Sequence, residues 1–212
     1  MNLGKRIMVI GSSGSGKSTT ARRIGEITGL PVFHMDNLWW LPGWQPRDPD
    51  EMYAMHTDII AQPEWVFDGN YSSTRDERMQ RADTVIFLDF HRTTCLWRVI
   101  KRRAMYHGKS RPDMTKGCHE KLDWQLIKMI WGHQKKRAGK LAWLAEIPPP
   151  KQVFHLKGNR AVRNFCRRLR ESHENTKQTN KANFLCNLCV VLNGGVWLRH
   201  AQPLYGSKQF VR

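Results

Sequence analysis

The sequence predicts an α/β fold in which a parallel sheet lies between two layers of helices. Short apolar segments rich in β-branched and aromatic residues recur along most of the chain, and helix-compatible segments separate them. Strands that alternate with helices are typical of parallel sheets covered on both faces, with right-handed crossovers between the strands. A glycine-rich segment directly after the first apolar run supports the same class. The length of 212 residues allows one such domain and an appendage.

Five strands are expected, and each is a short run bounded by glycine, proline or polar residues. The run TVIFLDF is the most apolar of them, so we expect it to be buried on both faces of the sheet. The expected strands cover residues 6–10, 31–36, 64–71, 84–90 and 151–158.

Six helices are expected between and after these strands. Three consecutive prolines, Pro148, Pro149 and Pro150, end the longest helix before the last strand, because proline cannot continue a helix. The expected helices cover residues 17–28, 50–62, 75–82, 93–105, 119–145 and 160–172.

The composition changes after about residue 173. The segment ENTKQTNKAN has the polar composition of a linker, and the apolar segment FLCNLCVVLNGGVWL that follows is interrupted by asparagines and a Gly-Gly pair. The second segment is either a strand pair at a sheet edge or an unrelated extension. We therefore expect one domain over residues 1–172 and a basic tail of unassigned role over residues 173–212.

The apolar runs and the cysteines indicate the cellular compartment in which we expect the protein. No stretch of 18 or more apolar residues exists, and the apolar run near the N-terminus is too short for a secretory signal. The cysteines show no disulfide framework, which predicts reduced thiols and a cytoplasmic protein without membrane contact. Cys186 and Cys189 form a C-x-x-C pair that we expect to be two small core residues, with zinc binding as the alternative.

Positive charge is concentrated in the second part of the chain. Residues 1–90 hold 9 Lys and Arg against 12 Asp and Glu, a net charge of −3, whereas residues 91–212 hold 26 against 6, a net charge of +20. Such asymmetry indicates a polyanionic partner, either nucleotide phosphates or nucleic acid, and a solvated basic surface is the alternative.

The segment GSSGSGKS, residues 11–18, is the strongest functional signal. It matches G-x-x-x-x-G-K-S/T, in which glycines let the backbone approach phosphate oxygens and the following helix directs its positive end at them. Lys17 would contact the β- and γ-phosphates of ATP, and the Ser18 hydroxyl would bind Mg²⁺. The expected nucleotide-binding residues are Gly11, Ser12, Ser13, Gly14, Ser15, Gly16, Lys17, Ser18 and Thr19.

Asp89 is a second candidate metal ligand because it ends the buried run VIFLD. A carboxylate at the carboxyl end of a central parallel strand lies beside the loop that follows the first strand, where it can orient Mg²⁺ or its water ligands. The alternative is that Asp89 caps the next helix.

Several segments together resemble the small P-loop proteins described as DNA topology modulation proteins, a group similar to adenylate kinase and other nucleoside monophosphate kinases. The resemblance covers about residues 3–171 and does not include the tail. The segments that carry it are GSSGSGKST, HMDNLWWLPGW, DGNYSSTRDERMQRADTVIFLDF, CLWRVIKRR and RPDMTKGCHEKLDW.

The resemblance implies a three-layer α/β/α P-loop kinase core with a five-stranded parallel sheet of order 2-3-1-4-5. It also implies an acceptor-binding segment over about residues 36–62 and a short helical lid over about residues 103–121. Arg98 and Arg102 have the spacing of two catalytic arginines at the base of such a lid, and the lid itself offers Arg111.

The resemblance is incomplete on the acceptor side. The loop K-G-N after the last strand is similar to the segment that lies against adenine in this family, which makes Gly158 a further nucleotide contact. The arginines that bind the acceptor in adenylate kinases have no clear equivalents here, and Arg75 is the nearest candidate. The nucleotide half of the family pattern is therefore present, whereas the acceptor half is not.

Two aspartates are candidates for the acceptor side. Asp36 ends the second expected strand and Asp68 the third, so both lie at the carboxyl edge of the sheet, where ligands bind in open α/β folds. A hydroxyl acceptor benefits from a carboxylate base, for which Asp36 is the first candidate, and capping of the following turn is its alternative role. His34 lies on a strand, and we expect it to be a packed residue.

The stretch DNLWWLPGWQPRD, residues 36–48, contains three tryptophans without helix or strand periodicity. Proline and glycine fix a turn-rich path. Flat aromatic faces beside a candidate base would form a stacking pocket for a ring of the acceptor, with Trp39 and Trp44 as the expected contacts. The alternative is that the tryptophans cover the core.

Two functions are compatible with these observations. The first is an ATP-dependent, Mg²⁺-using kinase that transfers the γ-phosphoryl group to a small nucleotide or nucleoside-like acceptor. The second is a nucleic-acid-binding regulator of DNA topology that uses ATP as a switch or not at all. The chain has no helix-turn-helix, zinc-finger or RNA-binding signature, but residues 160–170 hold five arginines and no acid, which would allow nonspecific DNA contact.

Overall fold

The computed structural model describes residues 1–120 and 123–192. The chain divides into two compact units, residues 1–173 and 174–212. The described part of the second unit, residues 174–192, is helical and continues α8, whose bounds are given below. We expected a linker here, followed by a strand pair or an extension; the described residues are helical instead, and the remainder of that segment lies outside them.

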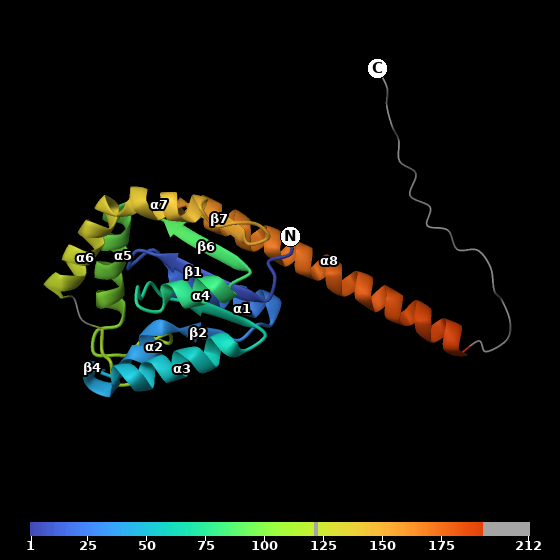
Figure 1. The fold of residues 1–212 in the computed structure, drawn as a ribbon, viewed down its shortest axis with the longest axis horizontal. Coiled ribbons are helices and arrows are strands. Elements are labelled where there is room, and N and C mark those ends of the chain that lie inside the picture. The colour runs from blue at the N-terminus through green and yellow to red at the C-terminus, as the bar shows by residue number, and fades with distance from the viewer. Residues whose placement is uncertain (121–122, 193–212) are drawn as a thin grey trace, which may run out of the picture. The chain divides into compact units, whose positions relative to one another are not determined.

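The first unit contains all the strands of the described residues, and helices connect them (Figure 1). The strands are β1 (Arg6–Gly11), β2 (Val32–His34), β3 (Trp40–Leu41), β4 (Gln45–Pro46), β5 (Trp65–Asp68), β6 (Thr84–Asp89) and β7 (Gln152–Lys157). The helices are α1 (Lys17–Thr28), α2 (Met35–Trp39), η1 (Pro42–Trp44), α3 (Pro49–Ala61), α4 (Arg75–Arg81), α5 (Arg92–Met105), α6 (Trp124–Lys135), α7 (Arg137–Ala145) and α8 (Gly158–Leu192).

Five strands form one parallel sheet in the order β2-β5-β1-β6-β7. In chain order these are the five expected strands, so the predicted order 2-3-1-4-5 is confirmed. Within the register, Met8 of β1 lies opposite Phe67 of β5 and Val85 of β6. The central position of β1 places the loop after Gly11 between the carboxyl ends of β5 and β6.

The sheet is buried on both faces because helices pack on each side of it. Ile7 and Val9 of β1 join one apolar cluster with residues of α1, α5 and α8, whereas Met8 and Ile10 join a second cluster with residues of α2, α3 and α7. This alternation follows from the period of two along a strand. Helices therefore cover both faces of the parallel sheet, which is the expected three-layer α/β/α arrangement.

Three expected elements differ from the structure. The strand expected over residues 31–36 ends at His34, so Asp36 lies in α2 and does not end a strand. The helix expected over residues 119–145 is two helices, α6 and α7, which meet at Lys136. The expected helical lid is not helical between Tyr106 and Glu120, where the chain forms turns and one bridge between Ser110 and His119. Among the described residues, no helix combines the length and apolar character needed to cross a membrane.

Candidate active site

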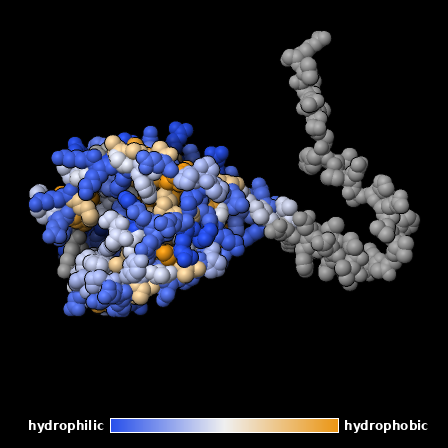
Figure 2. Space-filling model, viewed as in Figure 1, coloured by the Kyte–Doolittle hydropathy of each residue, from blue (hydrophilic) through white to orange (hydrophobic). Residues whose placement is uncertain are grey.

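A cavity of about 1550 Å³ lies at the carboxyl edge of the sheet, and most of the candidate residues line it. Its walls come from the loop after β1, the ends of β2 and β5, the hairpin β3–β4, the segment after α5, and the helices α6 and α7. Figure 2 shows a mainly hydrophilic surface on this unit, with a hollow between the region of α5 and α6 and the region of α2 and α3.

The loop between β1 and α1 has the geometry of a phosphate cradle. Gly14 and Gly16 have φ angles of 77° and 93°, which favour glycine, and a Cβ at Gly14 would lie 2.3 Å from the carbonyl oxygen of Cys95. Gly16 is the N-cap of α1 and gives it no side-chain cap, and no acidic residue lies in the first turn. The first N–H groups of α1 therefore stay available to an anion.

Lys17 and Ser18 begin α1 at the floor of the cavity. The Lys17 Nζ donates to the carbonyl oxygen of Ser12 at 3.0 Å, which folds the side chain back over the loop. Burial lowers the pKa of Lys17, while the carboxylates of Asp68 and Asp36 oppose that shift. Ser15 Oγ is buried and has no hydrogen-bond partner among the described residues. Its hydroxyl could therefore donate to an oxygen of a bound ligand.

Asn70 braces this loop, and the sequence did not single it out. Its Oδ1 accepts from the Gly11 backbone N–H at 3.1 Å, and its Nδ2 donates to the Gly11 carbonyl oxygen. Asn70 follows β5 in the segment DGNY. An asparagine directly after a strand at the ligand-binding edge was the available signal.

The two aspartates of the acceptor side lie in the cavity near Lys17. Asp68 is 3% exposed, and its Oδ1 lies 2.6 Å from Nδ1 of His34. Burial alone would lower the pKa of His34, but the hydrogen bond and charge of Asp68 outweigh it and raise that pKa. His34 is thus more than a packed residue, because it fixes the Asp68 carboxylate.

Asp36 has a different environment. Burial raises the pKa of its carboxyl group; Lys17 opposes this shift and the neighbouring charge of Asp68 adds to it. Asp36 lies in the first turn of α2, and no hydrogen bond or ion pair of its side chain occurs within the described part of the chain. A carboxylate with a raised pKa that faces a cavity suits proton transfer.

Asp89, the second candidate metal ligand, is bound by protein side chains in the structure. Arg137 Nε lies 3.0 Å from both of its carboxylate oxygens, Arg137 Nη2 donates to Oδ2 at 2.7 Å, and His155 Nε2 lies 2.7 Å from Oδ2. Burial would raise the pKa of Asp89, but these hydrogen bonds outweigh it and lower the pKa. The carboxylate fixes the start of α7 and does not line the cavity.

The described residues hold no group of three or more His, Cys, Asp or Glu side chains that could bind a metal unaided. The Ser18 hydroxyl and the carboxylates of Asp36 and Asp68 line one cavity. Hydroxyl, carboxylate and phosphate oxygens are the ligands that Mg²⁺ prefers. The Ser18 hydroxyl and one of these carboxylates therefore fit a magnesium ion that is held jointly with nucleotide phosphates.

Arg98 is bound to the phosphate loop itself. Its Nη1 donates to the carbonyl oxygen of Ser15 at 2.8 Å and of Gly14 at 3.3 Å, and its Nη2 donates to Oδ1 of Asn159. The guanidinium also lies over the Phe90 ring, 4.2 Å from its centroid. Arg98 thus ties the loop to the start of α8. Arg98 lines the cavity, but several of its N–H groups donate to oxygens of the protein, which fits a positioning role.

Arg102 and Arg111 both line the cavity, and one buried carboxylate joins them. Glu120 is 3% exposed; its Oε1 accepts from Arg102 Nε at 2.6 Å, and its Oε2 lies 2.8 Å from Arg111 Nε. Burial, together with the charge of Arg111, lowers the pKa of Arg102. The sequence pointed to the arginines but missed Glu120, which holds them side by side.

The tryptophan-rich stretch divides between the core and the cavity. Trp39 packs against Tyr71 with ring centroids 5.5 Å apart, belongs to the second core cluster and does not line the cavity. Trp39 is therefore a partly buried packing residue in this structure, and its contact with the acceptor stays a prediction. Trp40 and Trp44 do line the cavity, and their centroids lie 5.4 Å apart in an edge-to-face arrangement.

The same stretch contacts residues 106–120, the part of the chain expected to form a lid and called the lid segment below. Trp44 Nε1 donates to the carbonyl oxygen of His119 at 2.7 Å, and Thr115 Oγ1 donates to that of Trp40 at 2.7 Å. The Gly43 N–H donates to the Gly117 carbonyl oxygen at 3.2 Å. The hairpin β3–β4 and the lid segment thus form a continuous wall over the cavity.

The remaining candidates divide in the same way. Arg75 lines the cavity with its guanidinium 4.9 Å from the Trp143 ring centroid. Gly158 begins α8 with a φ of 73° and does not line the cavity, whereas its neighbour Asn159 does. The lysines of α6 and α7 that line the cavity were not identified from the sequence. A run of basic residues, KKRAGK, was the only signal for them.

Comparison with known proteins gives limited information. No protein-family model matches the chain, so the resemblance to the DNA topology modulation group is not confirmed. No curated protein sequence matches it either.

Solved structures with a similar course of the chain include three kinases. A gluconokinase from Sinorhizobium meliloti 1021 is 18% identical, with 86% of this chain and 99% of that chain covered and a TM-score of 0.45. A shikimate kinase from Bacteroides thetaiotaomicron is 19% identical, with 80% and 98% covered and a TM-score of 0.45. A putative kinase from Chloroflexus aurantiacus is 13% identical, with 80% and 98% covered and a TM-score of 0.47. Similarity this low says nothing about the substrate of this chain.

Proposed function

We propose that this protein is an ATP-dependent kinase that transfers the γ-phosphoryl group to a hydroxyl of a small acceptor, with a nucleotide or nucleoside-like compound as the first class to test. One observation carries the proposal. A phosphate cradle, a carboxylate with a raised pKa and two paired arginines line the same cavity. Phosphoryl transfer needs positioning and positive charge around the transferred group, and these residues supply both.

The nucleotide half of the cavity fits ATP with Mg²⁺. The loop over residues 11–16 and the first N–H groups of α1 would hold the phosphates, and Lys17 would add a charge beside them. Ser18 and Asp68 would hold Mg²⁺ together with phosphate oxygens, and the ion neutralises phosphate charge when bound. Asp89 is not proposed as a ligand because its carboxylate is bound to Arg137 and His155.

Asp36 is the proposed base for the acceptor hydroxyl. Its pKa is raised by burial, whereas Asp68 is committed to His34 at 2.6 Å. A base works best when its pKa lies near the working pH, and proton removal in the transition state typically contributes about 10²–10⁴-fold to the rate. Asp68 would then keep His34 and the metal side of the site in place.

Arg102 and Arg111 are the proposed charge-stabilising groups. Arginine stays ionised and binds phosphoryl oxygens with a planar fork of donors. Glu120 holds both guanidinium groups against the cavity. Arg98 is proposed to act indirectly, because it fixes the carbonyl groups of the phosphate loop.

The acceptor side is proposed to lie against Trp40 and Trp44, where an aromatic wall and the lid segment meet. The segments over about residues 36–62 and 103–121 would then act as the acceptor-binding segment and the lid of one domain. The nucleic-acid function stays a prediction from the sequence. The five arginines between residues 160 and 170 are all exposed on α8, as a solvated face would be.

Release of ADP from Mg·ATP tests the proposal, with nucleoside monophosphates, nucleosides and small hydroxyl compounds offered as acceptors. We expect one class to raise ADP release well above the acceptor-free sample, and Lys17→Ala to abolish the increase. No increase with any acceptor, together with binding of DNA that discriminates sequences at 200 mM salt, would favour the nucleic-acid function instead.

A further inference from the structure

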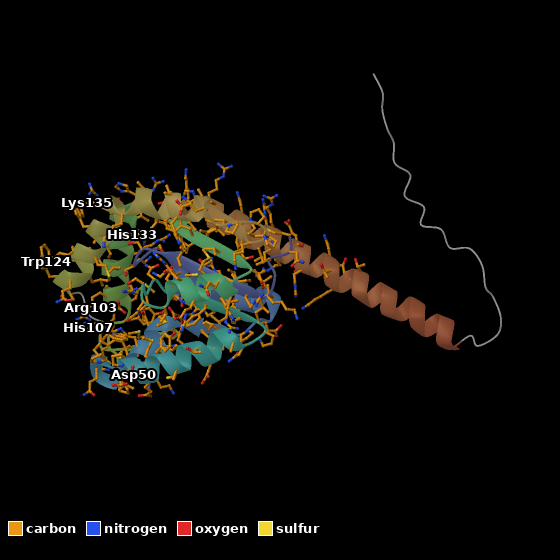
Figure 3. All side chains as sticks on the ribbon, in the orientation of Figure 1. Asp50, Arg103, His107, Trp124, His133 and Lys135 are labelled. Atoms are coloured by element: carbon orange, nitrogen blue, oxygen red, sulfur yellow. The ribbon has the colours of Figure 1, made fainter. Side chains whose placement is uncertain are left out.

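A second group of cations lines the cavity on the side of α6 and α7. It consists of Lys136 and Lys140, with Arg75 of α4 and the two rings of His133 and Trp143 beside them. Figure 3 shows His133 on the inner side of α6 and Lys135 at its outer side. None of these side chains has a role in the nucleotide site described above.

Helix α7 is anchored so that this group faces the cavity. Arg137, the first residue of α7, is held by Asp89 at the end of β6. Lys140 follows three residues later and lies on the same side of the helix, and Leu144 of α7 is buried in the core. The ion pair between Asp89 and Arg137 therefore also sets the position of Lys140.

The cations of this group lack carboxylate partners of their own. Within the described residues, neither Lys136 nor Lys140 forms an ion pair with an acid, and Arg75 pairs only with its neighbour Asp76, whose side chain is 70% exposed. Lys140 Nζ lies 2.7 Å from Nε2 of His133. Lys136 is exposed and Lys140 is partly buried, so the repulsion between these cations acts mainly on Lys140, and an anion bound beside it would relieve this cost in free energy.

The titration of these groups agrees with that geometry. Burial, with the charges of Lys140 and Lys17, lowers the pKa of His133 to about 4, so the neutral ring accepts from Lys140 near pH 7. Burial, with the charges of Lys17, Arg75 and Lys136, lowers the pKa of Lys140 to about 8. Lys140 is therefore still mainly charged near pH 7, and within the described residues the charges that shift its pKa are all positive.

We propose that Lys140, Lys136 and Arg75 form an anion subsite that binds a phosphate or carboxylate group of the acceptor. This inference rests on the proposed kinase function and narrows its substrate class: the acceptor is a hydroxyl compound that already carries an acidic group. The Trp143 ring holds the Arg75 guanidinium in place, and neutral His133 orients the Lys140 ammonium. A neutral sugar or nucleoside would leave the three charges unpaired.

The test uses the full chain saturated with Mg²⁺ and the non-hydrolysable ATP analogue AMP-PNP, so that the phosphate loop is occupied. Inorganic phosphate and acetate are then titrated separately in a calorimeter. We expect saturable binding of at least one anion, weakened about ten-fold or more by Lys140→Met, because a charge-assisted contact is lost. Tighter phosphate binding would assign a phosphate group to the acceptor, and tighter acetate binding a carboxylate.

Three controls separate a charge effect from a folding effect. Lys140→Arg keeps the charge and should retain binding within about three-fold, and Lys136→Met should weaken it by a smaller factor than Lys140→Met. Lys135→Met removes an exposed lysine that does not line the cavity and should leave binding unchanged. Affinity for the anion should fall as the pH rises past about 8, because Lys140 loses its proton there.

Several outcomes would overturn the inference: no anion binding by the loaded protein, equal binding by Lys140→Met, or loss of AMP-PNP binding in Lys140→Met, which would place Lys140 in the nucleotide site. If AMP-PNP does not bind the unaltered chain, the proposed function fails by itself. Phosphate is then titrated, without nucleotide, into Lys17→Ala and into a variant that carries both Lys17→Ala and Lys140→Met. Binding that still depends on Lys140 would support the subsite, and absence of binding would contradict it.

Discussion

The two sides of the cavity are built in different ways. The phosphate side is one continuous segment, residues 11–19, whose backbone N–H groups and glycine conformations shape the cradle. The opposite side is assembled from side chains of segments far apart in the sequence, including Trp44, Arg111 and Lys140. Contacts such as that of Trp44 with the His119 carbonyl oxygen join these segments.

The difference separates two kinds of information in the chain. A backbone cradle depends on glycine at a few positions, as the 2.3 Å approach at Gly14 shows, so it requires a local motif. A wall of side chains can change its charge and shape without changing the fold, so it decides which acceptor fits. We expect substitutions on the phosphate side to abolish turnover, and substitutions on the opposite side to alter affinity and selectivity.

The largest effect is expected from Lys17→Ala. Lys17 is the partly buried lysine at the start of α1, and the neighbouring cation Arg98 is already hydrogen-bonded to carbonyl groups of the loop. We expect kcat/KM to fall by about 10²–10³-fold, the usual effect of removing a preorganised charge from a transition state. Steady-state kinetics measure this, with the melting temperature as a folding control. A loss below about ten-fold would show that the cradle is not the catalytic centre.

Asp36→Asn tests the link between the two sides. If Asp36 is the base, kcat should fall about 10²-fold or more, while KM for ATP changes little. In the unaltered protein the rate should fall as the pH drops through the pKa of Asp36, which burial raises above the usual range. The pH–rate profile of Asp36→Asn should lose this acidic limb. An unchanged limb would assign the proton transfer to another group.

Glu120→Gln should have an intermediate effect. The substitution removes the negative charge that holds Arg102 and Arg111 together, so both guanidinium groups lose their fixed position. We expect kcat/KM for ATP to fall about ten-fold, since small misplacements of charged groups are costly in transfer reactions. Glu120→Asp should restore part of the rate. Equal rates for all three proteins would mean that this ion pair is only structural.

Trp44→Ala should weaken binding of the acceptor and leave binding of ATP unchanged. We expect KM for the acceptor to rise about five-fold through lost stacking, with KM for ATP unchanged. Trp44→Phe keeps a ring but removes the Nε1–H that donates to His119, so it separates stacking from the contact with the lid. Trp39→Ala is the matched comparison and should lower stability instead, because Trp39 packs in the core. An unchanged acceptor KM in Trp44→Ala would exclude Trp44 from the pocket.

Asp89→Asn should have the smallest effect on catalysis. We expect the Mg²⁺ concentration for half-maximal activity to stay the same, and the free energy of unfolding to fall by about 2 kcal/mol because charge-assisted hydrogen bonds are lost. The folded-state pKa of Asp89 is lowered, so its contribution to stability is present above the unfolded pKa of about 4 and is lost as the pH falls through the lower folded value. Denaturation at several pH values measures this, and a shifted Mg²⁺ requirement would contradict the structure.

The sequence predicted the strand, loop and helix of the phosphate side well because their signals are local. These signals follow one another directly in the sequence: the run RIMVIG, then the glycines, then the helix. The structure has the run as β1 and the helix as α1. The apolar runs located the five strands of the sheet, whereas their order was implied by the resemblance and agrees with the structure.

The opposite side was predicted less well because its contacts join distant residues. The partner of Asp89 is Arg137, 48 residues away, and nothing near Asp89 in the sequence indicates it. The packing of Trp39 against the core could not be predicted, because α2 is a single short helix and shows no periodicity in the sequence. The break between α6 and α7 at Lys136 has no proline to mark it, so the lysines of α7 were not recognised as part of the cavity.

The most direct test of the central claim follows the γ-phosphate itself. The chain is incubated with Mg²⁺, ATP radiolabelled in its γ-phosphate, and the acceptor class that gives most ADP, and the products are separated. The account predicts that the label appears in the organic acceptor, and that Lys17→Ala leaves it in ATP. Label found only as inorganic phosphate, or retained in ATP by the unaltered protein, would contradict the assignment of this cavity to phosphoryl transfer.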